Sequence, residues 1–161
     1  MTELHFLRHA HAGDPMSWDG PDEARPLSAK GERQADRLGL FLVSVRFAPD
    51  VFITSPKLRA SQTAAIVATH VGTRTEIDDR LAVAVSIETL EDILRDAGDP
   101  VRPVLVGHDP DLSTLVAELC GAPDIPMKKG ALARLDIDRP LRPGVGTLRW
   151  LVPPDLLANG R

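Results

Sequence analysis

A chain of 161 residues is long enough for one domain with a single sizeable hydrophobic core, and we expect one domain over residues 1–161. Hydrophobic residues make up 43% and charged residues 26%, which is typical of a globular protein and excludes a disordered tail. The net charge of −4 argues against a broad nucleic-acid-binding face, so we expect no nucleic-acid partner.

The N-terminal sequence ELHFL lacks the basic and apolar segments of a signal peptide, and no apolar run is long enough to cross a bilayer. We therefore expect a cytoplasmic protein that has no membrane partner. The single cysteine, Cys120, cannot form an internal disulfide, which agrees with a reducing compartment. Cysteine-dependent phosphatases need an arginine six residues after the cysteine, and here that residue is Pro126.

Apolar runs of strand length alternate along the chain with segments of helical spacing. Helical spacing is found at 38–45 and again at 112–119. Strands are predicted at 4–7, 50–54, 74–77, 104–107, 131–137 and 147–152. This alternation predicts an α/β fold, a three-layer α/β/α sandwich with a mostly parallel sheet, in which the last two strands form an antiparallel edge. The C-terminal segment 153–161 is expected to fray.

Two helix starts are marked by a capping residue followed by proline. Ser55 with Pro56, and Asp109 with Pro110, are predicted to be an N-cap and the first helical position. Each pair directly follows a short strand, so both junctions are expected at the carboxyl edge of the sheet. Ligands of open α/β sheets bind at that edge.

Cationic and imidazole side chains cluster at the same predicted edge. Arg8 and His9 end the first strand, Arg59 lies one turn into the next helix, and His108 ends the strand 104–107. The segment 12–27 has no helical or strand period, so we predict a loop beside these residues.

Two arginines and two histidines at one sheet edge predict a phosphate site. Guanidinium groups bind phosphate oxygens in a bidentate manner, and a helix N-terminus adds further N–H donors. A neutral imidazole held against a phosphate can attack phosphorus and form a covalent intermediate. The second imidazole can stabilise the oxygens of the transferring group.

Four segments, in this order, resemble the histidine phosphatase (phosphoglycerate mutase-like) superfamily: LRHAHA (7–12), RPLSAKGERQA (25–35), SPKLRASQTA (55–64) and VGHDPDLS (106–113). The resemblance spans nearly the whole chain. It implies a phosphoglycerate mutase-like fold in which His9 is the phosphoacceptor and Arg8, Arg59 and His108 complete the phosphate pocket. It implies no metal and no organic cofactor.

The short length and the segment 25–35 look like the small SixA-type phosphohistidine phosphatases. Larger relatives usually carry an acidic Glu where this chain has Val83, and an Asn where it has Pro15. Loss of a general acid slows release of an unactivated leaving group by about 10²–10⁴-fold. A phosphohistidine leaving group depends less on such an acid, which favours phosphohistidine as the substrate. An acid could still come from Asp14, Asp19 or Glu88.

Other candidate residues carry weaker signals. His11 can line the pocket or face solvent, and Arg25 can touch substrate, orient the loop or form an ordinary salt bridge. His5 and His70 are expected to be structural or exposed. Lys128 and Lys129 are expected in a solvated turn. The LDID segment at 135–138 lacks the continuation of the Asp-x-Asp phosphatases and is better explained as an edge strand.

The predicted function is hydrolysis of a phosphoryl group through a phosphohistidine on His9, with a phosphohistidine protein as the expected substrate. Alternatives are a phosphatase for phosphoserine proteins or small phosphate esters, and a non-catalytic module that binds a phosphorylated partner. A metal-dependent hydrolase is a further rival, because His9 and His11 form a His-x-His pair. Such a site would not favour Arg8 and Arg59 converging on the metal.

Overall fold

The computed structural model describes residues 1–158, and its centre is a six-stranded sheet. In spatial order the strands are β3 (Thr75–Ile77), β2 (Val51–Thr54), β4 (Pro103–Gly107), β1 (Thr2–Arg8), β5 (Leu132–Ile137) and β6 (Thr147–Val152). β3, β2, β4 and β1 are parallel, whereas β5 is antiparallel to β1 and β6 is antiparallel to β5. The predicted α/β fold and its antiparallel edge are confirmed.

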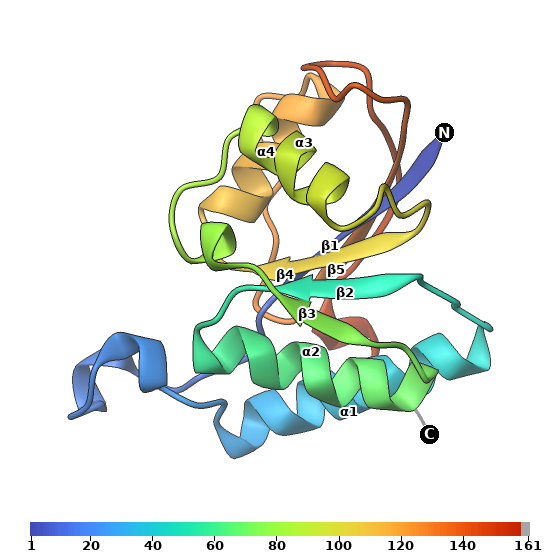
Figure 1. Ribbon diagram of the computed structural model, residues 1–161. Coiled ribbons are helices and arrows are strands. Elements are labelled where there is room, and N and C mark those ends of the chain that lie inside the picture. The colour runs from blue at the N-terminus through green and yellow to red at the C-terminus, as the bar shows by residue number, and fades with distance from the viewer. Residues whose placement is uncertain (159–161) are drawn as a thin grey trace.

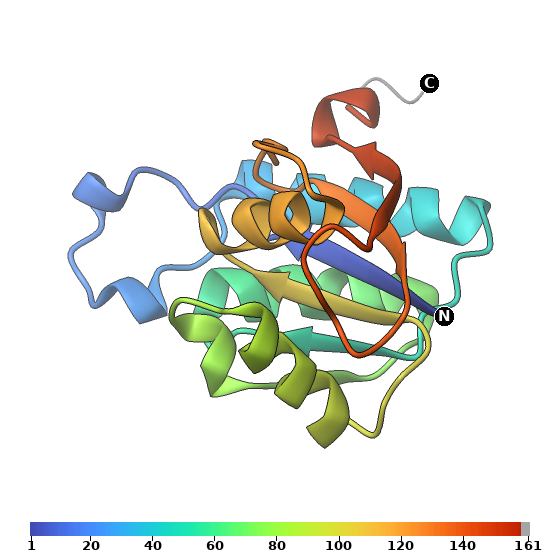
Figure 2. The same ribbon diagram turned by 90° about the horizontal axis from the view of Figure 1, so that it is seen from above.

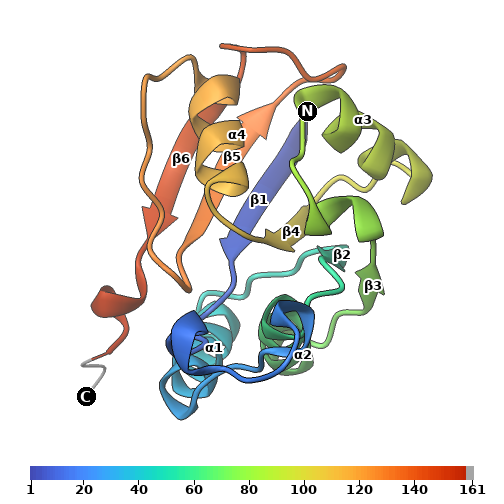
Figure 3. The ribbon, with the colours of Figure 1, turned by 90° about the vertical axis from the view of Figure 1, so that its left-hand side faces the viewer.

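Two helices cover each face of the sheet (Figure 1). α1 (Ala29–Ser44) and α2 (Leu58–Val71) lie together on one face, while α3 (Ile87–Asp96) and α4 (Asp111–Cys120) lie on the other. The three layers are also clear in the end view of Figure 3. This arrangement confirms the predicted α/β/α sandwich.

Side chains of the central strands point to both faces of the sheet, so the core is divided into two apolar clusters. On β1, Leu4 and Phe6 pack in the cluster that includes α3 and α4, and Leu7 packs in the cluster with α1 and α2. Adjacent β4 behaves in the same way, with Leu105 in the first cluster and Val104 in the second. Burial of both faces explains why these strands read as continuous apolar runs.

The segment 12–27 projects from the sheet as a long loop (Figures 1 and 2). It contains two short 3₁₀ helices, Pro15–Ser17 and Asp22–Ala24. Its far end is fixed by Ser28, whose hydroxyl accepts a hydrogen bond from the Gly31 amide at 3.1 Å and so caps α1. The loop therefore leaves and rejoins the body of the domain beside the carboxyl end of β1.

Gly31 brings α1 close to this loop. A Cβ atom at Gly31 would lie 1.9 Å from the His11 carbonyl oxygen, so no larger residue fits without moving the backbone. The RPLSAKGE segment therefore sets a close approach between a helix and the chain that follows β1.

Both predicted helix starts are displaced in the structure. α2 begins at Leu58, not at Pro56, because the Ser55 hydroxyl instead accepts from the Lys57 amide at 3.2 Å and closes a turn. α4 begins at Asp111, although Asp109 still caps it by accepting a hydrogen bond from the Ser113 amide at 3.1 Å. Helix starts commonly differ by one or two residues in this way.

Two other segments differ from the sequence-based expectation. α3 was not predicted, although Ser86 caps it by accepting from the Thr89 amide at 3.1 Å. The expected fraying of the C-terminus is wrong for Pro154–Leu156, which form a 3₁₀ helix. Residues 159–161 lie outside the described part of the chain. Within residues 1–158, no helix has the length and apolar character needed to cross a membrane.

Candidate active site

The predicted site residues meet where the parallel strands β1 and β4 end. Arg8 is the last residue of β1, and the His9 amide donates to the carbonyl of Gly107, the last residue of β4, at 3.0 Å. His108 follows directly. The Ala10 amide donates to Oγ1 of Thr63 on α2 at 3.1 Å, which ties the segment after β1 to the helix that carries Arg59. Three segments distant in sequence are thereby fixed at one edge.

The His9 imidazole is held in one orientation by its own backbone. Its Nδ1 lies 2.7 Å from the Ala10 carbonyl oxygen, which can only accept, so Nδ1 carries the proton and Nε2 has a free lone pair. Burial, reinforced by the Arg59 and Arg8 cations, lowers the pKa of His9 from 6.5 to about 4. The ring is therefore neutral at pH 7, the form that a nucleophile requires.

His108 lies beside His9, with ring centroids 5.2 Å apart. Its Nε2 is 2.8 Å from the Ser55 hydroxyl, so the serine that does not cap α2 positions the second imidazole instead. Burial, together with His9 and Arg59, lowers the pKa of His108 to about 3. Binding of a dianion would favour the protonated ring and raise this pKa.

Arg59 points to the loop as well as to the site. The residue is only 6% exposed, and its guanidinium donates to the Asp22 carbonyl at 2.8 Å and to the Asp22 carboxylate at 2.9 Å. Partial burial of Asp22 opposes ionisation, but the hydrogen bonds from Arg59 and Arg25 prevail and lower the pKa of its carboxyl. An ionised carboxylate therefore lies on the arginine that is expected to bind phosphate.

Arg8 is oriented by two partners that do not belong to the loop 12–27, Met127 and Asp109. Its Nη1 donates to the Met127 carbonyl at 2.7 Å and lies 3.4 Å from the Asp109 carboxylate. These contacts leave Nε of Arg8 buried and without a partner among the described residues. The cation is thus fixed in direction before any ligand binds.

Unpartnered polar atoms are concentrated at this site. In residues 1–158 only four buried side-chain nitrogen or oxygen atoms lack a hydrogen-bond partner, and Nε of Arg8, Nε of Arg59 and Nδ1 of His108 are three of them. Buried polar atoms are ordinarily paired, because an unpaired one costs roughly 1–3 kcal/mol. Three such atoms on three converging side chains indicate a place for a ligand rich in hydrogen-bonding atoms.

The two weaker candidates support the loop. Arg25 is buried, donates to the Ala12 carbonyl at 2.9 Å and lies 3.3 Å from the Asp22 carboxylate. His11 places Nδ1 2.6 Å from the Ser28 hydroxyl that caps α1. Both side chains therefore hold the ends of the segment 12–27, and their direct partners are parts of the loop and of α1.

Asp22 and Lys129 belong to the site but were not anticipated. Lys129 was expected in a solvated turn, yet it is half-buried, and burial followed by the nearby Arg8, Arg25 and Arg59 lowers the pKa of its amine. The next residue, Gly130, donates its amide to the carbonyls of Arg8 and His9, which fixes this turn against the end of β1. No local sequence signal distinguishes either residue, because their partners are far along the chain.

Asp14 and Glu88, two of the residues considered as a general acid, have local hydrogen-bond partners of their own. Asp14 caps the first 3₁₀ helix of the loop by accepting from the Met16 amide at 2.9 Å. Glu88 lies on the first turn of α3, and hydrogen bonds from the backbone and Ser86 lower the pKa of its carboxyl. Val83 is 64% exposed.

The His-x-His pair does not converge. His9 faces His108, whereas His11 contacts Ser28. Within residues 1–158 there is no group of three or more His, Cys, Asp and Glu side chains placed to hold a metal ion.

Comparisons with known proteins agree with this geometry. Residues 4–82 match the model of the histidine phosphatase superfamily, branch 1. An uncharacterised protein of Picosynechococcus sp. is 35% identical over 113 residues, which are 68% of each chain.

Solved structures resemble the chain over almost its full length. The protein histidine phosphatase SixA, solved with tungstate, is 27% identical with a TM-score of 0.81, and the match covers 97% of this chain and 99% of that one. A candidate SixA phosphohistidine phosphatase of Agrobacterium tumefaciens is 22% identical with a TM-score of 0.77, covering 94% and 97% of the two chains. From the ordered motifs, the sandwich fold and these matches, the chain belongs to the histidine phosphatase superfamily.

Proposed function

We propose that the protein is a SixA-type phosphatase that forms a phosphohistidine on Nε2 of His9, and that its substrate is a phosphohistidine carried by another protein. The observation that carries the proposal is the hydrogen bond from Nδ1 of His9 to the Ala10 carbonyl, because it leaves the Nε2 lone pair free beside His108. The similarity to SixA, solved with the tetrahedral oxyanion tungstate, supports the same assignment.

In the first step, Nε2 of His9 attacks phosphorus and the bond between phosphorus and the leaving nitrogen breaks. The electron pair returns to that nitrogen, and the substrate histidine leaves as a neutral imidazole when its other ring nitrogen is already protonated. The His9 ring becomes a cation that keeps its Nδ1 proton, and the Ala10 carbonyl at 2.7 Å stabilises this charge.

Arg8, Arg59 and His108 bind the three non-bridging oxygens during the transfer. Their unpartnered nitrogen atoms are available for this role, and fixed donors stabilise a transition state without reorganisation. In the second step, water attacks phosphorus and the bond to Nε2 breaks. The electron pair returns to His9, the product is H₂PO₄⁻, and the neutral ring is regenerated.

The preference for phosphohistidine rests on the leaving group. Val83 occupies the position where larger relatives usually carry their acidic residue, and Asp22 is held ionised by Arg59 and Arg25. Neither can donate a proton to an alkoxide at neutral pH. A leaving group that is already protonated avoids this requirement.

The test compares phosphate release from a phosphohistidine peptide and from an alkyl phosphate, with the wild-type protein and with His9→Ala. We expect turnover of the peptide at least 10²-fold faster than turnover of the alkyl ester, and loss of both with His9→Ala. Equal rates on the two substrates would contradict the preference for phosphohistidine. Phosphate binding without turnover of either substrate would contradict the enzyme proposal and indicate a phosphate-binding module.

A further inference from the structure

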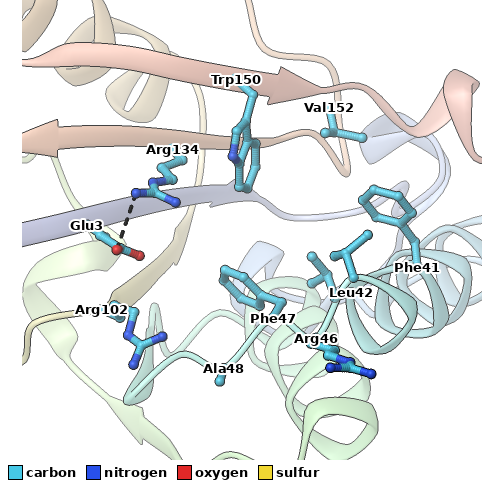
Figure 4. Close-up of a pocket in the computed structure, with 11 residues that line it drawn as sticks. Glu3, Phe41, Leu42, Arg46, Phe47, Ala48, Arg102, Arg134, Trp150 and Val152 are labelled. Carbon is cyan, nitrogen blue, oxygen red and sulfur yellow. Dashed lines mark ion pairs between the residues drawn. The ribbon is translucent and has the colours of Figure 1, made fainter.

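A hollow lies at the opposite edge of the sheet from the candidate active site. It has a volume of about 480 Å³ (Figure 4). Glu3 is near the start of β1, Phe47 precedes β2, and Arg102 directly precedes β4, so the hollow is at the amino ends of the parallel strands. The residues of the candidate active site follow the carboxyl ends of the same strands. No step proposed above uses this hollow.

The walls of the hollow are mainly apolar, and three of the lining residues are aromatic. Trp150 reaches in from β6. Leu42 faces it from the C-terminal end of α1, and Phe47 faces it from the turn that follows (Figure 4). Phe41 and Val152 extend the apolar surface. Aromatic walls of this kind accommodate a flat ring, because offset-stacked and edge-to-face arrangements are both favourable.

A buried histidine lies directly behind the aromatic walls. The His5 ring is fully buried, 4.9 Å from the Phe47 ring and 5.8 Å from the Trp150 ring between centroids. Its Nδ1 is 3.2 Å from the Pro103 carbonyl oxygen, so Nδ1 is the donor. Nε2 is the fourth buried side-chain atom without a partner in residues 1–158. The unpartnered buried atoms of the described chain are therefore confined to the candidate active site and to this second location.

The rim of the hollow is positively charged. Its lining contains Arg46, Arg102 and Arg134 and a single acidic residue, Glu3, which gives a formal charge of +2 in a protein whose net charge is −4. Arg134 is engaged, since it pairs with Glu3 at 3.3 Å and with Asp136 at 2.9 Å. Within residues 1–158, the side chains of Arg46 and Arg102 have no ion pair and no hydrogen bond. The Asp50 carboxylate near Arg102 is occupied by the amides of residues 101 and 102.

Arg46 also occupies an unfavourable backbone position. It follows the end of α1 with φ of 56°, in the left-handed region where helices usually place glycine. An arginine at this position strains the backbone, whereas a glycine would not. Replacing Arg46 by glycine would therefore remove the cation without destabilising the backbone, so the effect on ligand binding can be separated from an effect on stability.

We propose that this hollow is a binding site for a small molecule that combines a flat apolar ring system with an anionic group. The ring system lies between Phe47 and Trp150, and the anion pairs with Arg46 and Arg102. The site is distinct from the phosphate pocket, and the proposal does not depend on the phosphatase activity. α1 connects the two sites, because its first turn is capped by Ser28 beside His11 and its last turn lines the hollow.

The two tryptophans allow the two sites to be observed separately. Trp150 lines the hollow and Trp18 lies in the loop beside the phosphate pocket, so a proton–nitrogen correlation spectrum contains one indole signal for each site. Trp18→Phe assigns the signals. We expect 2-naphthoate to shift the Trp150 signal saturably, and the uncharged 2-naphthalenemethanol to bind at least about 5-fold more weakly. Equal affinity for the two compounds would overturn the anionic part of the proposal, and no saturable shift of Trp150 would overturn the site.

Variants of the rim test the arginines. Arg46→Gln combined with Arg102→Gln should weaken 2-naphthoate binding about 10-fold, whereas Arg142→Gln, at an exposed arginine that does not line the hollow, should leave it unchanged. Arg46→Gly should weaken binding while leaving the melting temperature unchanged or raised by about 2 °C. Unchanged binding in these variants would exclude the arginines as the anion site.

The anion can be a carboxylate or a phosphate, and the same signal distinguishes them. Binding of 2-naphthoate and 2-naphthyl phosphate is compared in the His9→Ala variant, so that the ester is not hydrolysed. Tighter binding of the naphthyl phosphate at the Trp150 signal assigns the hollow to aromatic phosphates, and tighter binding of the naphthoate assigns it to aromatic carboxylates. Shifts confined to Trp18 would contradict the site altogether.

Discussion

The two edges of the sheet use arginine and histidine in different ways. At the carboxyl edge, Arg59 is buried and bonded to the loop, and the rings of His9 and His108 lie side by side. At the amino edge, Arg46 and Arg102 are exposed, and the single histidine, His5, is covered by aromatic rings. Fixed, buried cations suit a transition state whose charge develops at known positions, whereas exposed cations around apolar walls suit simple binding.

The largest expected effect is a difference in kcat between variants of two neighbouring histidines, His9 and His11. His9→Ala removes the nucleophile and should lower kcat at least 10⁴-fold on a phosphohistidine peptide. His11→Ala removes the contacts with the Ser28 hydroxyl and the Gly13 amide, and it should lower kcat less than about 10-fold. Steady-state phosphate release measures both. Similar losses in the two variants would contradict the assignment of His9.

Arginines at the two edges should differ almost as strongly. Arg59→Ala should lower kcat/KM about 10²–10³-fold, because it removes a fixed donor to the transferring phosphoryl group. Arg46→Ala should leave the phosphatase activity unchanged, since it lines only the distant hollow. A comparable loss in both variants would mean that the second edge acts on catalysis.

Acid should destabilise the folded protein through histidines at both edges of the sheet. Burial lowers the pKa values of His5, His9 and His108 from 6.5 to about 4, 4 and 3. Between pH 6.5 and 4 the unfolded chain therefore binds more protons than the folded one, and the free energy of unfolding falls as the pH drops. We expect each histidine to contribute about 3 kcal/mol to this loss.

One variant and one ligand separate the contribution of His5 from those of His9 and His108. His5→Gln should remove one part of the pH dependence, measured by urea unfolding at pH 7 and pH 4.5. Inorganic phosphate should stabilise the protein through His9 and His108, and it should do so equally in the wild-type protein and in His5→Gln. A pH dependence that is unchanged in His5→Gln would contradict the low pKa of His5.

The smallest expected effect concerns the loop. The Asp22 carboxylate is 2.9 Å from Arg59, where it competes with an anionic ligand. Asp22→Asn should therefore tighten the binding of inorganic phosphate about 3–10-fold, measured by calorimetry. Weaker binding would show instead that Asp22 acts mainly to orient Arg59.

The sheet and the four residues that end its strands or begin its helices at the candidate site were predictable from sequence because their signals are local. Apolar runs marked every strand except β3, whose sequence is TEI, and the chain order of Arg8, His9, Arg59 and His108 placed them at one edge. α3 also carried a local signal, the apolar spacing of Ile87, Leu90, Ile93 and Leu94 after Ser86. That signal is masked by the acidic residues that alternate with the apolar ones in this segment.

The remaining features depend on contacts between distant residues. Ser55 followed by proline has the local pattern of an N-cap, but its hydroxyl bonds to His108, 53 residues away. Asp22 reaches Arg59 over 37 residues, and Lys129 reaches the site only because Gly130 is pinned to the end of β1. Such partners are decided by tertiary packing, which overrides local preference.

The most direct measurement is mass spectrometry of the protein after rapid alkaline quenching during turnover of a phosphohistidine peptide. We predict a base-stable, acid-labile phosphoryl adduct on the peptide that contains His9, formed in the wild-type protein and absent in His9→Ala. Phosphate release from the wild-type protein with no adduct at any quench time, or an adduct on His108 in place of His9, would contradict the assignment of His9 as the nucleophile.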